Sequence, residues 1–161
     1  GYMVGKQYEQ GGMIKHGSKM IQAVTNATVP QITFMIGASF GAGNYGMCGR
    51  GYDPRFLFSW PNAQTGVMGP EQAASTMTIV AEGSAKRRGR KVDRAKLDAQ
   101  EKRIIAHFSS QLSALYTSGQ VLDDGIIDPR DTRNLLGFVL ATCWEAEQRN
   151  MFPNTFGVAR M

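Results

Sequence analysis

The stretch QITFMIGASFGAGNYGMCGRGY, residues 31–52, places a short apolar run directly before a cluster of glycines. The continuous apolar residues at 32–36 predict a strand that is covered on both faces, as in a parallel sheet. The small residues at 41–43 leave the following turn bare, so that its backbone N–H groups can face a cleft without a side chain in the way. A helix that begins near Asn44 would add the positive end of its dipole there.

The same order of elements returns further along the chain. FLFSW (56–60) and QTGVMG (64–69) predict two strands, and Pro70 with Glu71 beside it predicts the start of the helix EQAASTMTIV. Amphipathic spacing predicts a helix in MIKHGSKMIQAV (13–24) as well. Strands, bare turns and helices in this repeated order predict an α/β domain.

Two more helices are predicted in the second half of the chain. One runs over about 92–115, after a basic segment. The other has Asp128 as its N-cap, Pro129 at the first helical position and Asp131 at the third. The acids of DDGIID (123–128) are interpreted as turn and cap residues rather than as catalytic groups.

The glycine turn allows three chemical interpretations. Two adjacent amides can bind an oxyanion, and one such donor stabilises a developing charge by about 3 kcal/mol. The pattern Gly41-x-Gly43-x-x-Gly46 matches a dinucleotide fingerprint, but Gln64 stands about where the ribose-binding acid is required. A phosphate loop would need a lysine, which this turn lacks. Glycines that serve only close helix–sheet packing, with no chemistry, are a fourth interpretation.

Side-chain catalysts are scarce in this sequence. It has no GxSxG and no HExxH, and its two histidines, His16 and His107, are isolated. No metal site is therefore predicted. Cys48 and Cys143 are far apart without a CxxC pattern and are interpreted as reduced, partly buried thiols. If the protein is an enzyme, we expect backbone amides and a cofactor to carry its chemistry.

The net charge of +5 comes from one segment. Residues 84–103 hold nine of the 18 basic residues but three of the 13 acidic ones, so the rest of the chain is nearly balanced. The segment has no aromatic residue, and no nucleic-acid partner is predicted. A solvated helix or lid is the first interpretation, and a patch for an anionic partner is the second.

The hydropathy of the chain and its first residues carry two further predictions. No apolar run approaches the ~18–20 residues of a membrane helix, and no secretory signal is visible at the start. We therefore predict no membrane association. The chain opens without an initiator methionine, and we expect it to be cut from a longer polypeptide.

Four stretches carry a resemblance to a known family: GYMVGKQYEQGGMIKHGSKM, GASFGAGNYGMCGRGYDPRFLFSWPNA, VMGPEQAA and DDGIIDPRDTR, together with the chain end FGVARM. They closely resemble the carboxyl-terminal part of the carboxyltransferase β subunit of biotin-dependent acyl-CoA carboxylases. The similarity is greatest to methylcrotonoyl-CoA and geranyl-CoA carboxylases and covers essentially the whole chain.

This resemblance implies a crotonase-like (ClpP/crotonase) fold of stacked ββα units. Residues 1–161 would form most of the biotin-facing carboxyl-terminal domain, and the amino-terminal acyl-CoA-binding domain would be absent. The implied partners are that domain, a second β subunit in a hexamer, and an α subunit that carries biotin carboxylase and biotin. The implied location is the cytoplasm in a bacterium or the mitochondrial matrix in a eukaryote.

The resemblance also implies the reaction. A carboxyl group would pass from carboxybiotin to an acyl-CoA, with an oxyanion hole for the biotin ureido oxygen at the amides of Ala42 and Gly43. The pocket wall is predicted to contain Phe40, Gly41, Asn44, Tyr45, Met68 and Gly69. The resemblance does not decide which acyl-CoA is carboxylated. The isolated chain is expected to be inactive, because half of each active site would lie in the other domain.

Two other functions compete with this prediction. The first is the carboxyltransferase of a sodium-pumping acyl-CoA decarboxylase, which runs similar chemistry in reverse. The second is a non-catalytic interaction module that binds an anionic partner through residues 84–103, with Arg87, Arg88 and Arg90 as its basic contacts.

Overall fold

The computed structural model describes the chain except residues 1, 4, 90 and 151–161. Arg90 and the chain end FGVARM lie outside the described residues. Two compact units are present, Gly1–Pro129 and Arg130–Met161, and each is described by itself. The first unit opens with two helices, α1 (Lys6–Gln10) and α2 (Met13–Asn26), as the amphipathic pattern predicts for the second of them.

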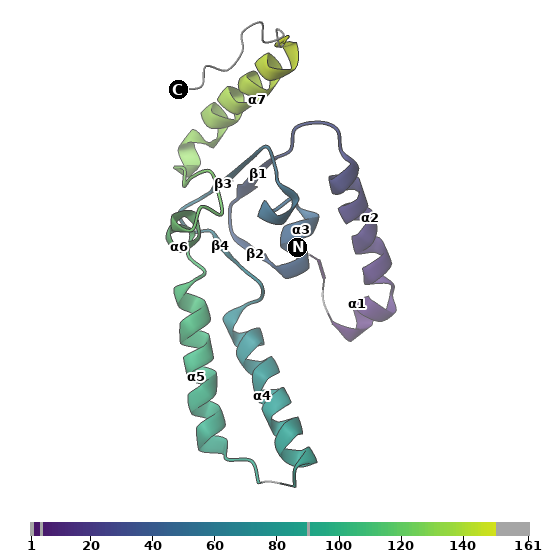
Figure 1. Ribbon diagram of the computed structural model, residues 1–161, viewed down its shortest axis with the longest axis vertical. Helices are drawn as coiled ribbons and strands as arrows, with labels where there is room; N and C mark the ends of the chain where they lie inside the picture. Colours follow the sequence, from purple (N-terminus) through teal and green to yellow (C-terminus); the bar gives the residue numbers. More distant parts are fainter. Residues whose placement is uncertain (1, 4, 90, 151–161) are drawn as a thin grey trace, which may run out of the picture. The chain divides into compact units, whose positions relative to one another are not determined.

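Two ββα repeats follow in the first unit (Figure 1). The first consists of β1 (Ile32–Met35), β2 (Ala38–Phe40) and α3 (Gly41–Gly46), and the second of β3 (Phe56–Ser59), β4 (Gln64–Gly66) and α4 (Pro70–Arg87). Corresponding strands of the two repeats pair in parallel, β1 with β3 and β2 with β4. The strand, turn and helix order predicted from the sequence is therefore confirmed.

The core lies between these repeats and the segment that follows them. Leu57 is fully buried, and Met35, Ala63 and Ala114 form one apolar cluster with it, against which Ile126 packs. On the opposite side of β1 and β3 the rings of Phe34 and Phe58 stack, with their centroids 5.7 Å apart. Alternate residues of β3 thus meet apolar partners on both faces, which explains the continuous apolar run.

The remaining residues of the unit extend both small sheets by single bridges. Ile126 pairs in parallel with Ser59 at the end of β3, and Ser113 pairs antiparallel with Gln64 of β4. A short helix, α6 (Ala114–Gly119), lies between these two points, and the Ser113 side chain caps it by accepting from the Tyr116 N–H. Within the DDGII segment, Ile126 therefore extends the sheet, and Asp123 and Asp124 before it form a bend.

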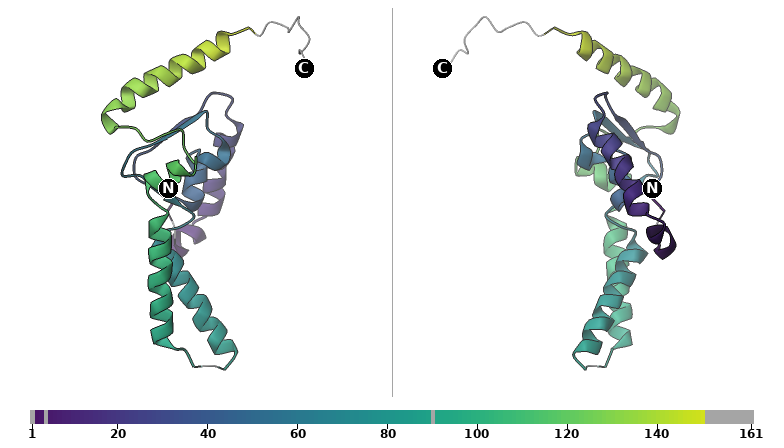
Figure 2. Two further views of the ribbon diagram at one scale, coloured as in Figure 1. Left: turned by 60° about the vertical axis from the view of Figure 1, so that its left-hand side comes forward. Right: turned by 90° about the vertical axis from the view of Figure 1, so that its right-hand side faces the viewer.

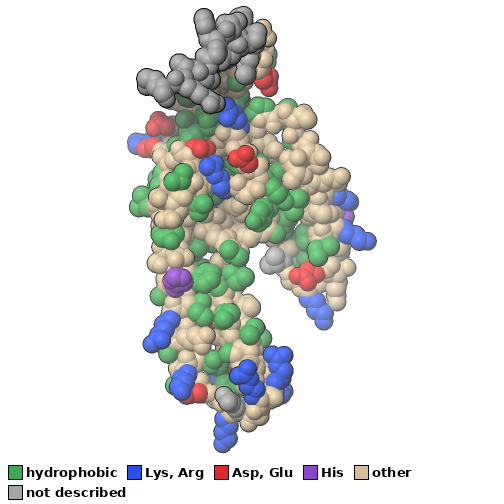
Figure 3. Space-filling model, viewed as in Figure 1, with side chains coloured by type: hydrophobic (Ala, Val, Ile, Leu, Met, Phe, Trp, Pro, Cys, Tyr) green, Lys and Arg blue, Asp and Glu red, His purple; other side chains and the backbone are tan. Residues whose placement is uncertain are grey.

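A helical hairpin projects from the strands (Figure 2). Its arms are α4 and α5 (Arg94–Ser110), which pack along each other, and an ion pair joins Arg94 to Glu82. The basic segment forms the free end of this hairpin, where Lys and Arg side chains gather on the surface (Figure 3). The sequence interpretation assigned this segment to a single helix or lid. The structure instead divides it between the end of α4 and the first half of α5.

Two predicted helix starts were wrong. Helix α3 begins at Gly41 rather than near Asn44, because the left-handed conformation of Gly41 (φ 52°) turns the chain from strand to helix at one residue. Near the other predicted start, Pro129–Asp131 forms a 3₁₀ turn, and α7 (Thr132–Gln148) starts after it with Asp131 at the N-cap. Such turns often precede helices.

Candidate functional site

The centre of the candidate site is the turn from β2 into α3. Gly41 has a φ of 52°, and a Cβ at this position would lie 2.9 Å from the Val67 carbonyl oxygen. Only glycine combines this conformation with this close approach. The N-cap residue, Phe40, makes no side-chain cap hydrogen bond to the helix. The amides of Ala42 and Gly43 therefore lie in a first helical turn whose N–H groups have no intrahelical acceptor.

Two cavities adjoin this helix. The larger, about 440 Å³, is walled by apolar side chains such as Leu57 and Leu112, and by Gly41, Asn44 and Tyr45. The smaller, about 250 Å³, runs along β1 and β2, with Gly43 and Asn44 in its wall. Asn44 belongs to both walls. A ligand in either space would meet the exposed backbone at the start of α3.

The predicted site residues separate into two groups. Gly41, Gly43, Asn44 and Tyr45 line the cavities, and Ala42 is exposed beside them. The other three predicted residues, Phe40, Met68 and Gly69, do not belong to either wall. Phe40 is half-buried in β2, Met68 is exposed, and Gly69 is the N-cap of α4.

The sequence interpretation missed Arg50. Its side chain lines the larger cavity and lies 3.9 Å from a carboxylate oxygen of Asp124. Arg50 follows the glycine stretch directly in sequence, which is the signal that could have found it. The cavity wall thus combines apolar side chains with one guanidinium group that faces a carboxylate.

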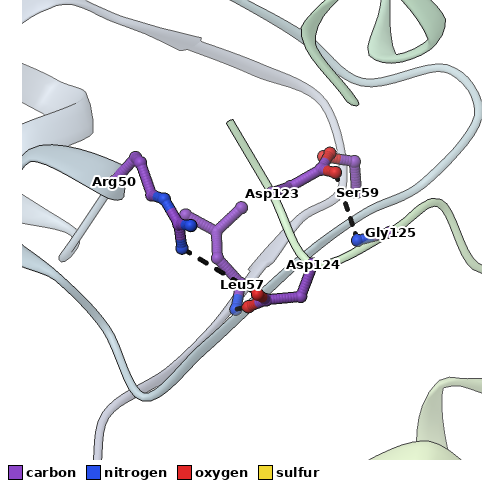
Figure 4. A network of polar contacts seen from close by, with 6 residues as sticks. All are labelled: Arg50, Leu57, Ser59, Asp123, Asp124 and Gly125. Carbon is purple, nitrogen blue, oxygen red and sulfur yellow. Dashed lines mark hydrogen bonds and ion pairs between the residues drawn. The ribbon is translucent and has the colours of Figure 1, made fainter. Parts of the chain in front are cut away.

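The DDG motif fastens β3 to the chain that returns after the hairpin (Figure 4). The buried Ser59 hydroxyl donates to Asp123 Oδ2 at 2.6 Å, and the Gly125 N–H donates to Asp123 Oδ1 at 3.1 Å. Asp124 Oδ2 accepts from the Leu57 N–H at 2.7 Å, and the Asp124 N–H donates to the Leu57 carbonyl at 2.7 Å. Asp123 and Asp124 thus make the structural contacts that the sequence interpretation expects of them.

Cys48 is expected to resist alkylation in the native protein. Burial raises the pKa of its thiol, a contact with Thr33 opposes this, and the nearby Asp53 carboxylate raises the pKa further. The neutral thiol therefore predominates at pH 8, and the thiolate is the reactive form. Iodoacetamide labelling followed by peptide mapping should modify Cys48 at least about tenfold more slowly in native than in urea-unfolded protein. Equal rates in the two states would contradict this prediction.

Comparison with known proteins identifies the chain. The family model described as the carboxyl transferase domain matches residues 1–158. The chain belongs to the carboxyl transferase family. Its similarity to that family extends over the glycine turn, both ββα repeats and the DDG motif, so the family assignment predicted from the sequence is confirmed.

Two curated relatives of this carboxyl transferase chain match it over its whole length. A protein described as a probable biotin-dependent acyl-coenzyme A carboxylase beta2 subunit, from Mycobacterium tuberculosis, is 52% identical over 161 residues. The mitochondrial methylcrotonoyl-CoA carboxylase beta chain of Dictyostelium discoideum is 45% identical. The chain covers 30% of the first relative and 27% of the second, that is, about a third or less of either.

Solved structures give the same result. The crystal structure of the beta subunit of Pseudomonas aeruginosa geranyl-CoA carboxylase has a TM-score of 0.84 and 51% identity, covering 99% of this chain and 29% of that one. A transcarboxylase 12S structure, described as a hexamer assembly with substrate bound to a multienzyme core, has a TM-score of 0.66 and 29% identity, covering 97% of this chain and 28% of that one. The predicted fold class, a partial crotonase-like α/β domain, is confirmed.

Two features are absent from the described part of the chain. No helix there is both long and apolar enough to cross a membrane. No group of three or more His, Cys, Asp or Glu side chains in the same residues is arranged to hold a metal ion.

Proposed function

We propose that this chain is the biotin-facing part of an acyl-CoA carboxylase β subunit, which transfers a carboxyl group from carboxybiotin to an acyl-CoA. The observation that carries the proposal is the turn at Gly41, which presents the first amides of α3 without a capping side chain beside two cavities. The relatives that match over the full length of the chain include carboxylase β subunits described as biotin-dependent.

The residues present fit a bound ureido ring. A ureido oxygen needs hydrogen-bond donors, and the N–H groups of Ala42 and Gly43 are donors that the helix itself does not use. When bound, carboxybiotin would supply the carboxyl group. The N–H groups of Ala42 and Gly43 would hold its ureido oxygen, and each donor would stabilise negative charge there by about 3 kcal/mol.

Other parts of the chain support this turn. The positive end of the α3 dipole favours negative charge at the same place, although a helix of six residues contributes little. Gly43 lines the smaller cavity, whose wall includes the apolar residues Phe34 and Ile36, and amide donors act more strongly beside apolar groups than in bulk water. The chain thus supplies orientation and electrostatics, and the cofactor supplies the reacting group.

The acyl substrate is proposed as a class. Relatives named for methylcrotonoyl-CoA and geranyl-CoA match this chain at 45% and 51% identity, and both names denote branched enoyl-CoA substrates. We infer such an enoyl-CoA here. The proposed partners are the acyl-CoA-binding domain, a second β subunit in a hexamer, and a biotin-bearing α subunit. The proposed location is the cytoplasm in a bacterium and the mitochondrial matrix in a eukaryote.

Carboxylation of an acyl-CoA panel tests the proposal. The complete β subunit is combined with its biotin-bearing partner, bicarbonate and ATP, and fixation of labelled bicarbonate is measured with methylcrotonoyl-CoA, geranyl-CoA, propionyl-CoA and acetyl-CoA. We expect the branched enoyl-CoA substrates to give at least about tenfold higher kcat/KM, because a misfit of one or a few methylenes costs about 1–3 kcal/mol. Failure to carboxylate any of the four would contradict the proposal, and preference for propionyl-CoA would overturn the substrate class.

A further inference from the structure

The Asn44 side chain joins α3 to both strands that end beside it. Its Nδ2 group donates to the Ser39 hydroxyl at 2.9 Å and to the Thr65 hydroxyl at 3.4 Å. Ser39 lies in β2 and Thr65 in β4, and these two residues are paired in the parallel register. One carboxamide in the first turn of the helix therefore contacts two neighbouring strands.

The surrounding bonds fix the orientation of this carboxamide. The Thr65 hydroxyl donates its proton to the Ser39 carbonyl oxygen at 2.8 Å. The Thr65 oxygen can then only accept, so Asn44 must present its NH₂ group to it. Both Nδ2 protons are used within the protein, and Oδ1, which can only accept, is the remaining polar atom. A ureido oxygen needs donors, so the Asn44 side chain is unsuited to bind it directly.

Asn44 is held on its other side as well. The backbone carbonyl oxygen of Asn44 accepts from the Gly49 N–H at 2.8 Å, and a Cβ built at Gly49 would overlap the Asn44 carboxamide. The side chain thus fills the space above Gly49. Helix α3 has six residues, three of them glycine, and Phe40 gives it no side-chain cap. A helix this short and this rich in glycine is not stable in isolation, so external contacts must order it.

We propose that Asn44 is a positioning residue that orients the amides of Ala42 and Gly43 by tying the first turn of α3 to β2 and β4. The inference rests on the proposed function and replaces the prediction that Asn44 binds the cofactor. Donors of an oxyanion hole act only when their direction is fixed before the charge develops. Loss of the tie should weaken charge stabilisation and leave acyl-CoA binding intact.

The kinetic test uses Asn44→Ala and Asn44→Asp in the complete β subunit with its biotin-bearing partner. Asp has nearly the same shape, but its carboxylate cannot donate to Thr65, whose own proton bonds to the Ser39 carbonyl, so only a bond from the Ser39 hydroxyl can remain. Both variants should lower kcat between about 10-fold and 100-fold, the range of a small misplacement of catalytic groups, with KM for the acyl-CoA within about twofold. Asn62→Ala is the matched control, because Asn62 also donates through its Nδ2, in this case to the Ile36 carbonyl, and Asn62 itself lines neither cavity.

A double-mutant cycle separates the tie from a general packing effect. Ser39→Ala alone should lower kcat less than Asn44→Ala, and the double variant should be no worse than Asn44→Ala alone. Additive losses of kcat, or a rise in KM with kcat unchanged, would overturn the proposal. If Asn44→Ala does not fold, Asn44→Asp and Ser39→Ala decide the question.

Hydrogen exchange supplies a readout that needs no activity. The amides of Met47 and Cys48 bond to the carbonyls of Gly43 and Tyr45, and their exchange reports opening of α3. Asn44→Asp should raise exchange in this segment at least about tenfold over wild type and over Asn62→Ala. Unchanged exchange would overturn the proposal even if no acyl-CoA is carboxylated. A third outcome would overturn the proposal while the proposed function stands. In that outcome, Gly43→Val inactivates the enzyme, but Asn44→Asp changes neither hydrogen exchange nor kcat.

Discussion

Gly43→Val is expected to lower carboxyl transfer by the complete enzyme at least about 100-fold, the loss associated with one oxyanion-hole donor. The amide itself cannot be deleted by substitution, so this variant acts through geometry. Gly43 forms part of the wall of the smaller cavity, and a branched side chain here would occupy space next to its N–H group. The measurement is kcat for the preferred acyl-CoA in the panel, with assembly of the β subunit followed by light scattering.

Gly83→Val is the matched control for this variant. Gly83 lies within α4, and a Cβ added there meets no atom within 4 Å. The control therefore repeats the change in helix propensity without touching the turn. We expect it to keep kcat within about twofold of wild type, because it leaves the oxyanion donors in place. Near-normal turnover by Gly43→Val would contradict the proposal that the Gly43 N–H is an oxyanion donor.

Asp123→Ala is expected to have the largest effect on stability. Asp123 is 4% exposed, and its carboxylate accepts from the Ser59 hydroxyl, which is fully buried, and from the Gly125 N–H. Removing it leaves two donors without their acceptor inside the protein. The free energy of unfolding should fall by about 2–3 kcal/mol, the cost of a lost charged hydrogen bond in the interior. Urea denaturation of the complete subunit measures the change.

Two further variants decide how this loss arises. Asp123→Asn keeps the shape, one acceptor for Gly125 and one polar partner for Ser59, and we expect it to lose less than half as much stability. Asp98→Ala removes an exposed acid from α5 and should change stability by less than about 0.5 kcal/mol. Equal effects of Asp123→Ala and Asp98→Ala would show that the buried bond contributes nothing.

The sequence was most informative where structure is decided locally. The apolar run of β1, the glycines after β2 and Pro70 at the start of α4 each carry their signal within a few residues, and the elements form there. Helix boundaries were less predictable. The start of α3 depends on the left-handed conformation of Gly41, and a glycine alone does not reveal which conformation it adopts.

Contacts between distant residues were not predictable from single motifs. The tie of Asn44 to Thr65 spans 21 residues, and the bond of Asp123 to Ser59 spans 64. DDG predicts a turn but does not name the strand that its carboxylates meet. Arg50 was missed for the same reason, because its partner Asp124 and cavity-wall residues such as Leu112 lie far along the chain, after both repeats. The family resemblance contributed the roles proposed for Ala42 and Gly43, which residue patterns left open.

The bonds between β3 and the DDG motif also determine where the chain can change length. They join residues 64 and 67 positions apart, and the whole α4–α5 hairpin lies within the loop that they close. Doubling the length of such a loop costs only about 0.6 kcal/mol in closure entropy. Insertions and deletions near Gly89 should therefore accumulate as related chains diverge, while the distance between the glycine turn and its two strands stays constant. The length of the hairpin can therefore change among related chains while the geometry of the site stays the same.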